Sequence, residues 1–165
     1  MRMRRLSLLA GLALTVSILL PGSALAAVGG SDLPVSGSQV VSCVDNLVTL
    51  QGHCVGTGSA SHFGLSTMEA DVQLTPIATG FSESGTWKLT VANGDQMFGS
   101  VTGTSTTTDG VHFLGLGTWV STGGTGRLED ASATFHDVTS LTLVSVEGVI
   151  ATFSGEVAVD GRLSY

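Results

Sequence analysis

Four histidines are the side chains of this sequence best suited to bind a metal ion or to transfer a proton near neutral pH: His53, His62, His112 and His136. None lies two or four residues from another, and the chain has no HExxH motif, so their spacing does not support a zinc site. We interpret them as solvated or hydrogen-bonded structural residues, and we expect neither a metal nor another cofactor. His62, in the segment SHFG, is the one that we expect close to a bound ligand.

The hydroxyl and carboxyl side chains form no recognisable catalytic motif. Serine and threonine are abundant, but the chain has no GxSxG sequence, which positions the nucleophile in many hydrolases. Glu69 and Asp71 share one face of an expected strand, but this face alternates with an apolar one and is more simply the solvated exterior than a glycosidase acid pair. Glu147 and Glu156 lie in apolar runs, and we expect them at turns or at a rim. The sequence predicts no catalytic residue.

The chain has two cysteines, Cys43 and Cys54, in adjacent β-like segments separated by the turn-forming pair Asp45-Asn46. We expect them to form a disulfide, which suits an exported protein. By the loop-entropy argument, closing so short a loop stabilises the fold by about 3 kcal/mol. The alternative is metal binding together with the neighbouring His53, but the segment CVDNLVTLQGHC offers too few ligands for it.

The glycine-rich segment STGGTGRLEDASATF, residues 121–135, could bind a phosphate or form a turn. A phosphate-binding loop leads into a helix and usually carries a lysine. This segment has no lysine, continues with two acidic residues, and returns to strand-like alternation. We therefore expect a tight connection between strands, in which Gly123, Gly124 and Gly126 allow positive φ and close approach of the backbone.

The first residues have the layout of a secretory signal peptide. A basic start is followed by an apolar stretch from Leu6 to Leu20, by Pro21-Gly22 and by the small-residue site Ala24-Leu25-Ala26. The apolar stretch is short for a membrane anchor, which needs roughly 20 residues. The sequence predicts a signal peptide over residues 1–26, a secreted protein without a membrane span after cleavage, a flexible lead-in over 27–38 and a single domain over 39–165.

The charge of the mature chain excludes one class of partner. After removal of the signal peptide, only Lys88, Arg127 and Arg162 remain against thirteen aspartates and glutamates. A surface with this charge repels the phosphate backbone, so we expect no nucleic-acid partner.

From Gln39 onward, the sequence predicts short strands and no helix of useful length. MEADVQL and TWKLTVA alternate between apolar and polar residues, and Asn93-Gly94-Asp95 is a hairpin turn signal. VHFLGLGTWV and GVIATFSGEVAV are apolar on both faces. Glycine, at 23 of 165 residues, is about twice as frequent as usual and suits strands that coil tightly. These features favour an antiparallel β-barrel.

The two-sided strand VHFLGLGTWV predicts both a cavity and a covered outer surface. Its odd-numbered residues include Phe113 and Trp119 together with two glycines, which would leave room for an apolar ligand beside the two rings. We expect this face to point inward. His112, Leu114 and Leu116 then face outward, where a subunit would cover them, so we also expect a homo-oligomer.

NGDQMFGSVTG followed by STGGTGRLEDASATF resembles a pattern shared by allene oxide cyclases, dirigent proteins and small secreted bacterial proteins similar to them. GSASHFGLST, residues 58–67, is similar to the THLG segment of the bacterial proteins. The likeness spans roughly residues 48–165. It implies an all-β fold, an eight-stranded antiparallel β-barrel of the allene oxide cyclase-like or calycin-like kind, with a mostly apolar interior and often oligomeric. No active-site motif of the plant cyclases is present, so the resemblance implies an architecture and no activity.

Two functions follow from these expectations. The first is a non-catalytic secreted barrel that binds a small apolar ligand or a protein partner. The alternative is a cyclase or isomerase that folds a hydrophobic substrate within the cavity, because such catalysis needs shape more than a motif. A third reading, an outer-membrane barrel, lacks the aromatic girdles that such barrels carry. We expect His62, Phe113 and Trp119 to line the ligand site.

Overall fold

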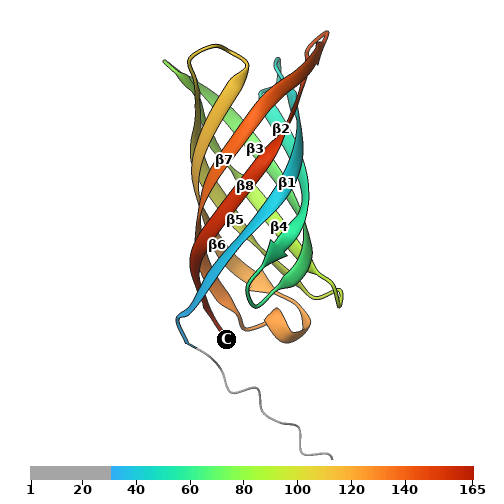
Figure 1. The fold of residues 1–165 in the computed structure, drawn as a ribbon, viewed down its shortest axis with the longest axis vertical. Coiled ribbons are helices and arrows are strands. Elements are labelled where there is room, and N and C mark those ends of the chain that lie inside the picture. Colours follow the sequence, from blue (N-terminus) through green and yellow to red (C-terminus); the bar gives the residue numbers. More distant parts are fainter. Residues whose placement is uncertain (1–30) are drawn as a thin grey trace, which may run out of the picture.

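The structure, a computed structural model, describes residues 31–165 and shows a closed barrel of eight antiparallel strands (Figure 1). The strands are β1 (Leu33–Asn46), β2 (Gln51–Ala60), β3 (Gly64–Ile77), β4 (Gly80–Val91), β5 (Gln96–Thr107), β6 (His112–Gly124), β7 (Ser132–Glu147) and β8 (Ile150–Ser164). One 3₁₀ turn, η1 (Gly126–Leu128), follows β6. Within the described range, no helix is long and apolar enough to cross a membrane. The predicted all-β barrel is confirmed, and the signal peptide expected over 1–26 lies outside the described residues.

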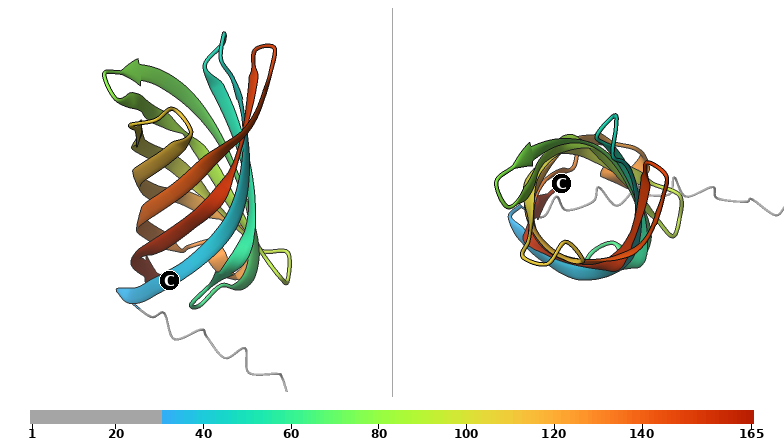
Figure 2. Two further views of the ribbon diagram at one scale, coloured as in Figure 1. Left: turned by 45° about the horizontal axis from the view of Figure 1, so that its top comes forward. Right: turned by 90° about the horizontal axis from the view of Figure 1, so that it is seen from above.

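Each strand pairs with the next along the chain, and β8 pairs with β1 to close the sheet (Figure 2). The β1–β8 pairing runs without interruption from Leu33 opposite Leu163 to Asn46 opposite Ile150. The turns after β1, β3, β5 and β7 gather at one end, which is the top in Figure 1 and is called the upper end here. The lower end carries the other three turns, η1 and the ends of β1 and β8 that close the barrel.

Alternate residues of each strand face the barrel interior, because successive side chains of a strand point to opposite faces. In β7, Ala133, Phe135 and Asp137 are buried, whereas Thr134 and His136 between them are exposed. The same alternation holds in the other strands, with the odd-numbered residues of β1, β4, β5, β6 and β8 facing inward and the even-numbered residues of β2 and β3. The inward set forms the core.

Large side chains fill the lower end of the barrel. Met97 and Leu163 are fully buried there, in one cluster with Leu128 of η1 and Phe63 of the β2–β3 turn. The ring of Phe63 packs edge-to-face on that of Phe135, with 6.0 Å between the ring centroids. The lower end is therefore plugged by the protein itself.

The barrel begins earlier in the chain than the sequence analysis expected. β1 starts at Leu33, inside the segment 27–38 that was expected to be a flexible lead-in. The reason is pairing with the last strand: Leu33 lies opposite Leu163, and Val35 is buried in the core although polar residues and glycines surround it in the sequence. The boundary between lead-in and domain therefore lies before Leu33.

Cys43 and Cys54 form the predicted disulfide. They lie directly opposite each other in the β1–β2 ladder, with their Cα atoms 4.0 Å apart, and both side chains are on the inward face. The chain reverses over residues 47–50, just after the expected Asp45-Asn46 pair. The Asn46 side chain stabilises this turn, because its Oδ1 accepts hydrogen bonds from the backbone N–H groups of Val48 and Thr49, at 2.9 and 3.0 Å.

The glycine-rich segment connects β6 to β7 at the lower end, as predicted. Gly126 has φ of +59°, in the left-handed region that favours glycine. The carboxylate of Asp95, in the β4–β5 turn, accepts a hydrogen bond from the backbone N–H of Arg127 at 3.2 Å. A Cβ atom at position 126 would meet this carboxylate, and one at Gly124 would meet the carbonyl oxygen of Leu128. Both glycines are therefore structural.

Gly126→Ala should destabilise the barrel by more than Gly110→Ala. Both positions have positive φ, which costs a non-glycine residue about 1–3 kcal/mol, but a Cβ at Gly110 meets no atom within 4 Å. Urea denaturation of the two variants measures the difference in unfolding free energy. Equal losses would show that the contact with Asp95 contributes nothing.

Reduction of the disulfide should lower the unfolding free energy by about 3 kcal/mol, because the unfolded chain gains the freedom of the opened loop. Oxidised and reduced wild-type protein have the same side chains, so urea denaturation of both isolates the effect of the bond. Intact-mass analysis with alkylation verifies each state. A loss below about 1 kcal/mol would contradict the entropic argument.

Candidate functional site

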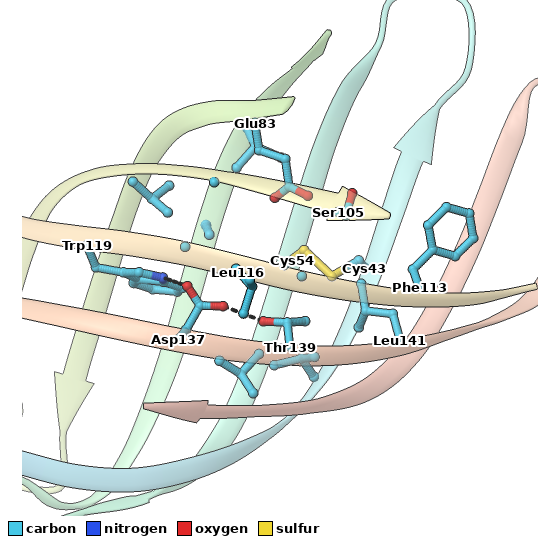
Figure 3. Close-up of a pocket in the computed structure, with 18 of the residues that line it drawn as sticks. Cys43, Cys54, Glu83, Ser105, Phe113, Leu116, Trp119, Asp137, Thr139 and Leu141 are labelled. Atoms are coloured by element: carbon cyan, nitrogen blue, oxygen red, sulfur yellow. Dashed lines mark hydrogen bonds between the residues drawn. A yellow bond between two sulfur atoms is a disulfide. The ribbon is translucent and has the colours of Figure 1, made fainter. Parts of the chain in front are cut away.

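A cavity of about 80 Å³ lies in the barrel interior, above the plugged lower end (Figure 3). Apolar side chains from five strands contribute most of its wall: Val41, Met68, Ala70, Val72, Val101, Leu141 and Val157. The disulfide Cys43–Cys54 forms part of the same wall. A second void of about 50 Å³ shares Glu83, Ser105 and Phe113 with it and continues toward the upper end, where Asp45 and Phe81 are partly exposed. The interior is thus accessible from the upper end.

β6 lines the cavity with the face that the sequence analysis expected. Phe113 and Trp119 both contribute to the wall, and Gly115 and Gly117 lie between them on the same face. The Phe113 ring packs edge-to-face on Phe153 at the upper end, with ring centroids 5.3 Å apart. Trp119 lies deeper, with its ring centroid 5.6 Å from that of Trp87. The inward direction of Phe113 and Trp119 is confirmed, and their role in ligand binding stays a prediction.

His62 lies away from this cavity. It is exposed in the β2–β3 turn at the lower end, with φ of +69°, and its Nε2 is 3.2 Å from the backbone oxygen of Pro34. The large side chains of the plug, Phe63 among them, separate this turn from the cavity. His62 was expected near the mouth of the ligand site, but it lies at the lower end of the barrel, whereas the cavity is accessible from the upper end.

Asp137 of β7 is a buried carboxylate in the cavity wall, with 7% of its surface exposed. Two groups donate hydrogen bonds to it: Trp119 Nε1 to Oδ1 at 2.7 Å, and Thr139 Oγ1 to Oδ2 at 2.6 Å (Figure 3). Gly117 lies directly opposite Asp137 in the β6–β7 ladder, and a Cβ there would meet Oδ1. The glycine therefore provides the space for the carboxylate, and the two donors offset the cost of burying it.

Two further carboxyl groups, of Glu83 in β4 and Asp45 in β1, face the same interior nearer the upper end. Burial raises the pKa of Glu83 above its usual value, a hydrogen bond with Ser105 opposes this shift, and the charge of Asp137 adds to it. Burial also raises the pKa of Asp45, to about 6, with a further contribution from the charge of Glu83. Three acidic side chains from three strands thus influence one another across the cavity.

None of these three acids was predicted as a site residue, although the sequence carries a signal for them. Asp137 has the same parity as Phe135, Glu83 the same parity as Trp87, and Asp45 the same parity as Cys43. Each therefore belongs to the inward face of its strand. Glu69 and Asp71 are exposed, as expected of a solvated exterior, and Glu147 is exposed at the end of β7, beside a turn. Glu156 was expected at a turn or a rim but is exposed in the middle of β8, because its even-numbered position faces outward.

The remaining histidines lie on the outer surface or in turns. His53 pairs with Asp71 on the outside of the β2–β3 ladder, and His112 pairs with Asp109 in the β5–β6 turn, each with 2.7 Å between nitrogen and oxygen. His136 contacts the Thr118 hydroxyl. Within residues 31–165, no group of three His, Cys, Asp or Glu side chains converges in a way that could hold a metal ion.

The outer face of β6 and β7 carries exposed apolar side chains. Leu114, Leu116 and Val138 are 53%, 57% and 50% exposed, and Leu116 lies directly opposite Val138. Leu114 and Leu116 belong to the outward set that was expected to be covered by a subunit. The homo-oligomer stays a prediction.

Asp45→Asn should stabilise the protein near neutral pH but not at acidic pH. Folding raises the pKa of Asp45 from 3.8 to about 6, so the folded state binds this proton more tightly than the unfolded state does. The wild type therefore loses stability as the pH rises from 3.8 to about 6 and the buried Asp45 carboxyl group has to ionise. The asparagine side chain of the variant stays uncharged, so the variant does not lose this stability. Melting temperatures of variant and wild type should differ at about pH 7.5 and converge near pH 4.

The matched control for this comparison is Asp160→Asn, because Asp160 is exposed on the outside of β8. Its melting temperature should follow that of the wild type at both pH values. A constant difference between Asp45→Asn and wild type across the range would contradict the assigned cause.

Comparison of the chain with protein-family models, with curated proteins and with solved structures gave no match. The resemblance to allene oxide cyclases and dirigent proteins stays a prediction from the sequence. The barrel and its cavity are therefore the observations from which a function can be proposed.

Proposed function

We propose that this protein is a secreted, non-catalytic barrel that binds a small, mostly apolar molecule in its interior. The observation that carries the proposal is the cavity, which has apolar walls, one plugged end and a few polar groups that converge on it. This combination is typical of small-molecule sites, in which apolar surface supplies affinity and a few polar atoms orient the ligand.

The cavity has a specific cause in the sequence. Protein interiors are normally packed without voids larger than a water molecule. Here Gly103 of β5 lies directly opposite Gly117 of β6, and Gly115 is nearby on the same inward face. The Asp137 carboxylate takes the space at Gly117, and a Cβ at Gly103 would meet the carbonyl oxygen of Leu116, so of the three glycines it is Gly115 whose missing side chain leaves room in the cavity. An apolar ring bound beside Trp119 would occupy this space.

Secretion is part of the proposal. The intramolecular disulfide is consistent with an extracellular protein, since such bonds persist in oxidising compartments. The signal peptide expected over residues 1–26 points to the same location.

Glu83 favours the alternative function, a cyclase or isomerase. Burial raises the pKa of its carboxyl group, so that it carries a proton at higher pH than an exposed glutamate does. A protonated carboxyl in an apolar cavity could act as a general acid on a hydrophobic substrate. The binding proposal is simpler because it requires only the cavity. Turnover of a bound molecule that disappears in Glu83→Gln would favour the enzyme.

Toluene should bind in the cavity and change the fluorescence of Trp119. Titration of the wild type should give a saturable signal that is largely lost in Trp119→Phe, where Trp87 supplies the remaining emission. Gly115→Val should abolish binding because its side chain enters the cavity, where the nearest atom to its Cβ belongs to Thr139, at 3.1 Å. Leu114→Val, on the outer face of the same strand, is the matched control and should bind as the wild type does.

Melting curves of all variants verify that they fold. Toluene affinity in folded Gly115→Val equal to that of the wild type would place the ligand elsewhere. Failure of the wild type to bind any of toluene, benzene, benzyl alcohol and benzylamine would contradict the proposed function.

A further inference from the structure

The polar groups of the cavity consist mostly of acceptors. Asp45, Glu83 and Asp137 contribute carboxyl groups, and Asp137 already receives hydrogen bonds from Trp119 and Thr139. Deeper in the interior, in a void of about 40 Å³ that also reaches Trp119, the side-chain oxygen Oε1 of Gln39 is buried and has no hydrogen-bond partner among the described residues. A ligand that only accepts hydrogen bonds would meet few donors here, the Ser105 hydroxyl among them.

The described part of the chain supplies no positive charge to the interior. Its Lys, Arg and His residues all lie on the outer face or in turns: His53, His62, Lys88, His112, Arg127, His136 and Arg162. Lys88 pairs with Glu69 on the outside at 2.9 Å, and Arg127 pairs with Asp95 in the lower turns at 3.5 Å. Among residues 31–165, the acids of the cavity therefore have no ionic partner.

The position of the acids fits a ligand with one charged end. Asp45 is the second-last residue of β1, and Glu83 is close to the start of β4, so both lie toward the accessible upper end. The apolar wall beside Trp119, Met68 and Val101 lies deeper. A molecule that enters from above with its apolar part first would leave its other end beside these two carboxyl groups.

We propose that the ligand is a small amine, whose apolar ring or chain lies in the cavity beside Trp119 and whose ammonium group pairs with Glu83 and Asp45. This inference rests on the proposed function and adds the chemical class of the ligand. An ammonium group donates the hydrogen bonds that the cavity lacks, and its charge offsets the cost of burying the carboxylates. An anion would be repelled, and a neutral alcohol would supply a donor without the charge.

The test compares three probes of similar size: benzylamine, benzyl alcohol and toluene. Binding to wild-type protein at about pH 7.5 is followed through the indole N–H signal of Trp119 by NMR, since this group lies in the cavity wall. Benzylamine should bind at least about tenfold more tightly than benzyl alcohol, which is a typical advantage of a charge-assisted hydrogen bond. Glu83→Gln should reduce benzylamine affinity about tenfold and leave the affinity for toluene within about twofold.

Glu156→Gln is the matched control, because it removes a glutamate charge from the exposed outer face of β8. It should leave the affinities of all three probes within about twofold of the wild-type values. Asp45→Asn is the second test variant, and it should reduce benzylamine affinity by severalfold. It keeps the proposal testable where Glu83→Gln folds poorly.

Acidification should change the affinity for benzylamine and the affinity for toluene in different ways. Benzylamine stays protonated between about pH 7.5 and about pH 5, while Asp45, whose pKa is about 6, gains a proton over this range. Glu83, whose pKa burial also raises, changes in the same direction, and Asp137 is the one other titratable group that faces them within the described barrel. Benzylamine affinity should therefore fall at least about fivefold on acidification, whereas toluene affinity should stay equal or rise.

The outcomes separate the two proposals. If benzyl alcohol or toluene binds as tightly as benzylamine, or if Glu83→Gln and Asp45→Asn both leave benzylamine affinity unchanged, the amine inference is overturned and the proposed function stands. If none of the three probes binds, both are overturned.

Discussion

Closure of the sheet determines which side chains of the eight strands point into the barrel. In an open sheet, an edge strand can slip along its neighbour, and a slip of one residue moves each side chain to the opposite face. In this barrel each strand is held on both sides, and β1 and β8 pair over their whole length. A slip in one strand would have to be matched all around the ring. The inward set of residues is therefore defined by parity alone, whatever its polarity, which is how acidic residues come to face an apolar interior.

The volume of the inward side chains then divides the interior into two parts. Methionine, leucine and aromatic side chains fill the lower end, and η1 adds Leu128 to them. Above them, Gly103 and Gly117 stand opposite each other where two side chains would otherwise meet. A barrel of eight strands is just wide enough to be filled by side chains, so inward-facing glycines leave part of it unfilled. Gly117 gives its space to the Asp137 carboxylate, and Gly115 borders the cavity that remains. The unfilled part lies toward the upper end, where Asp45 and Phe81 are partly exposed.

The alternation of apolar and polar residues indicated a β-barrel, because parity is a local property of a strand. The disulfide was predicted from the single pair of cysteines in adjacent β-like segments, and the inward direction of Phe113 and Trp119 from the two glycines that share their face. The start of β1 could not be predicted, since Leu33 and Val35 become buried only by pairing with a strand at the far end of the chain. The acids of the cavity were missed for a related reason. A carboxyl group in an alternating pattern is normally solvated. Only the strand pairing, which places Gly103 opposite Glu83 and Gly117 opposite Asp137, shows that each acid has space inside.

The seam between β1 and β8 has a consequence for the order of folding. All other strand pairs are hairpins between consecutive segments, which can form early because their loops are short. The seam joins Leu33 to Leu163, and so almost the entire described chain forms the loop that it closes. The entropy of closing a loop grows with its length, and the pairing partner exists only once the last strand is available. Until then both outer strands expose unpaired backbone, so the nascent barrel is most prone to aggregate just before its final strand docks.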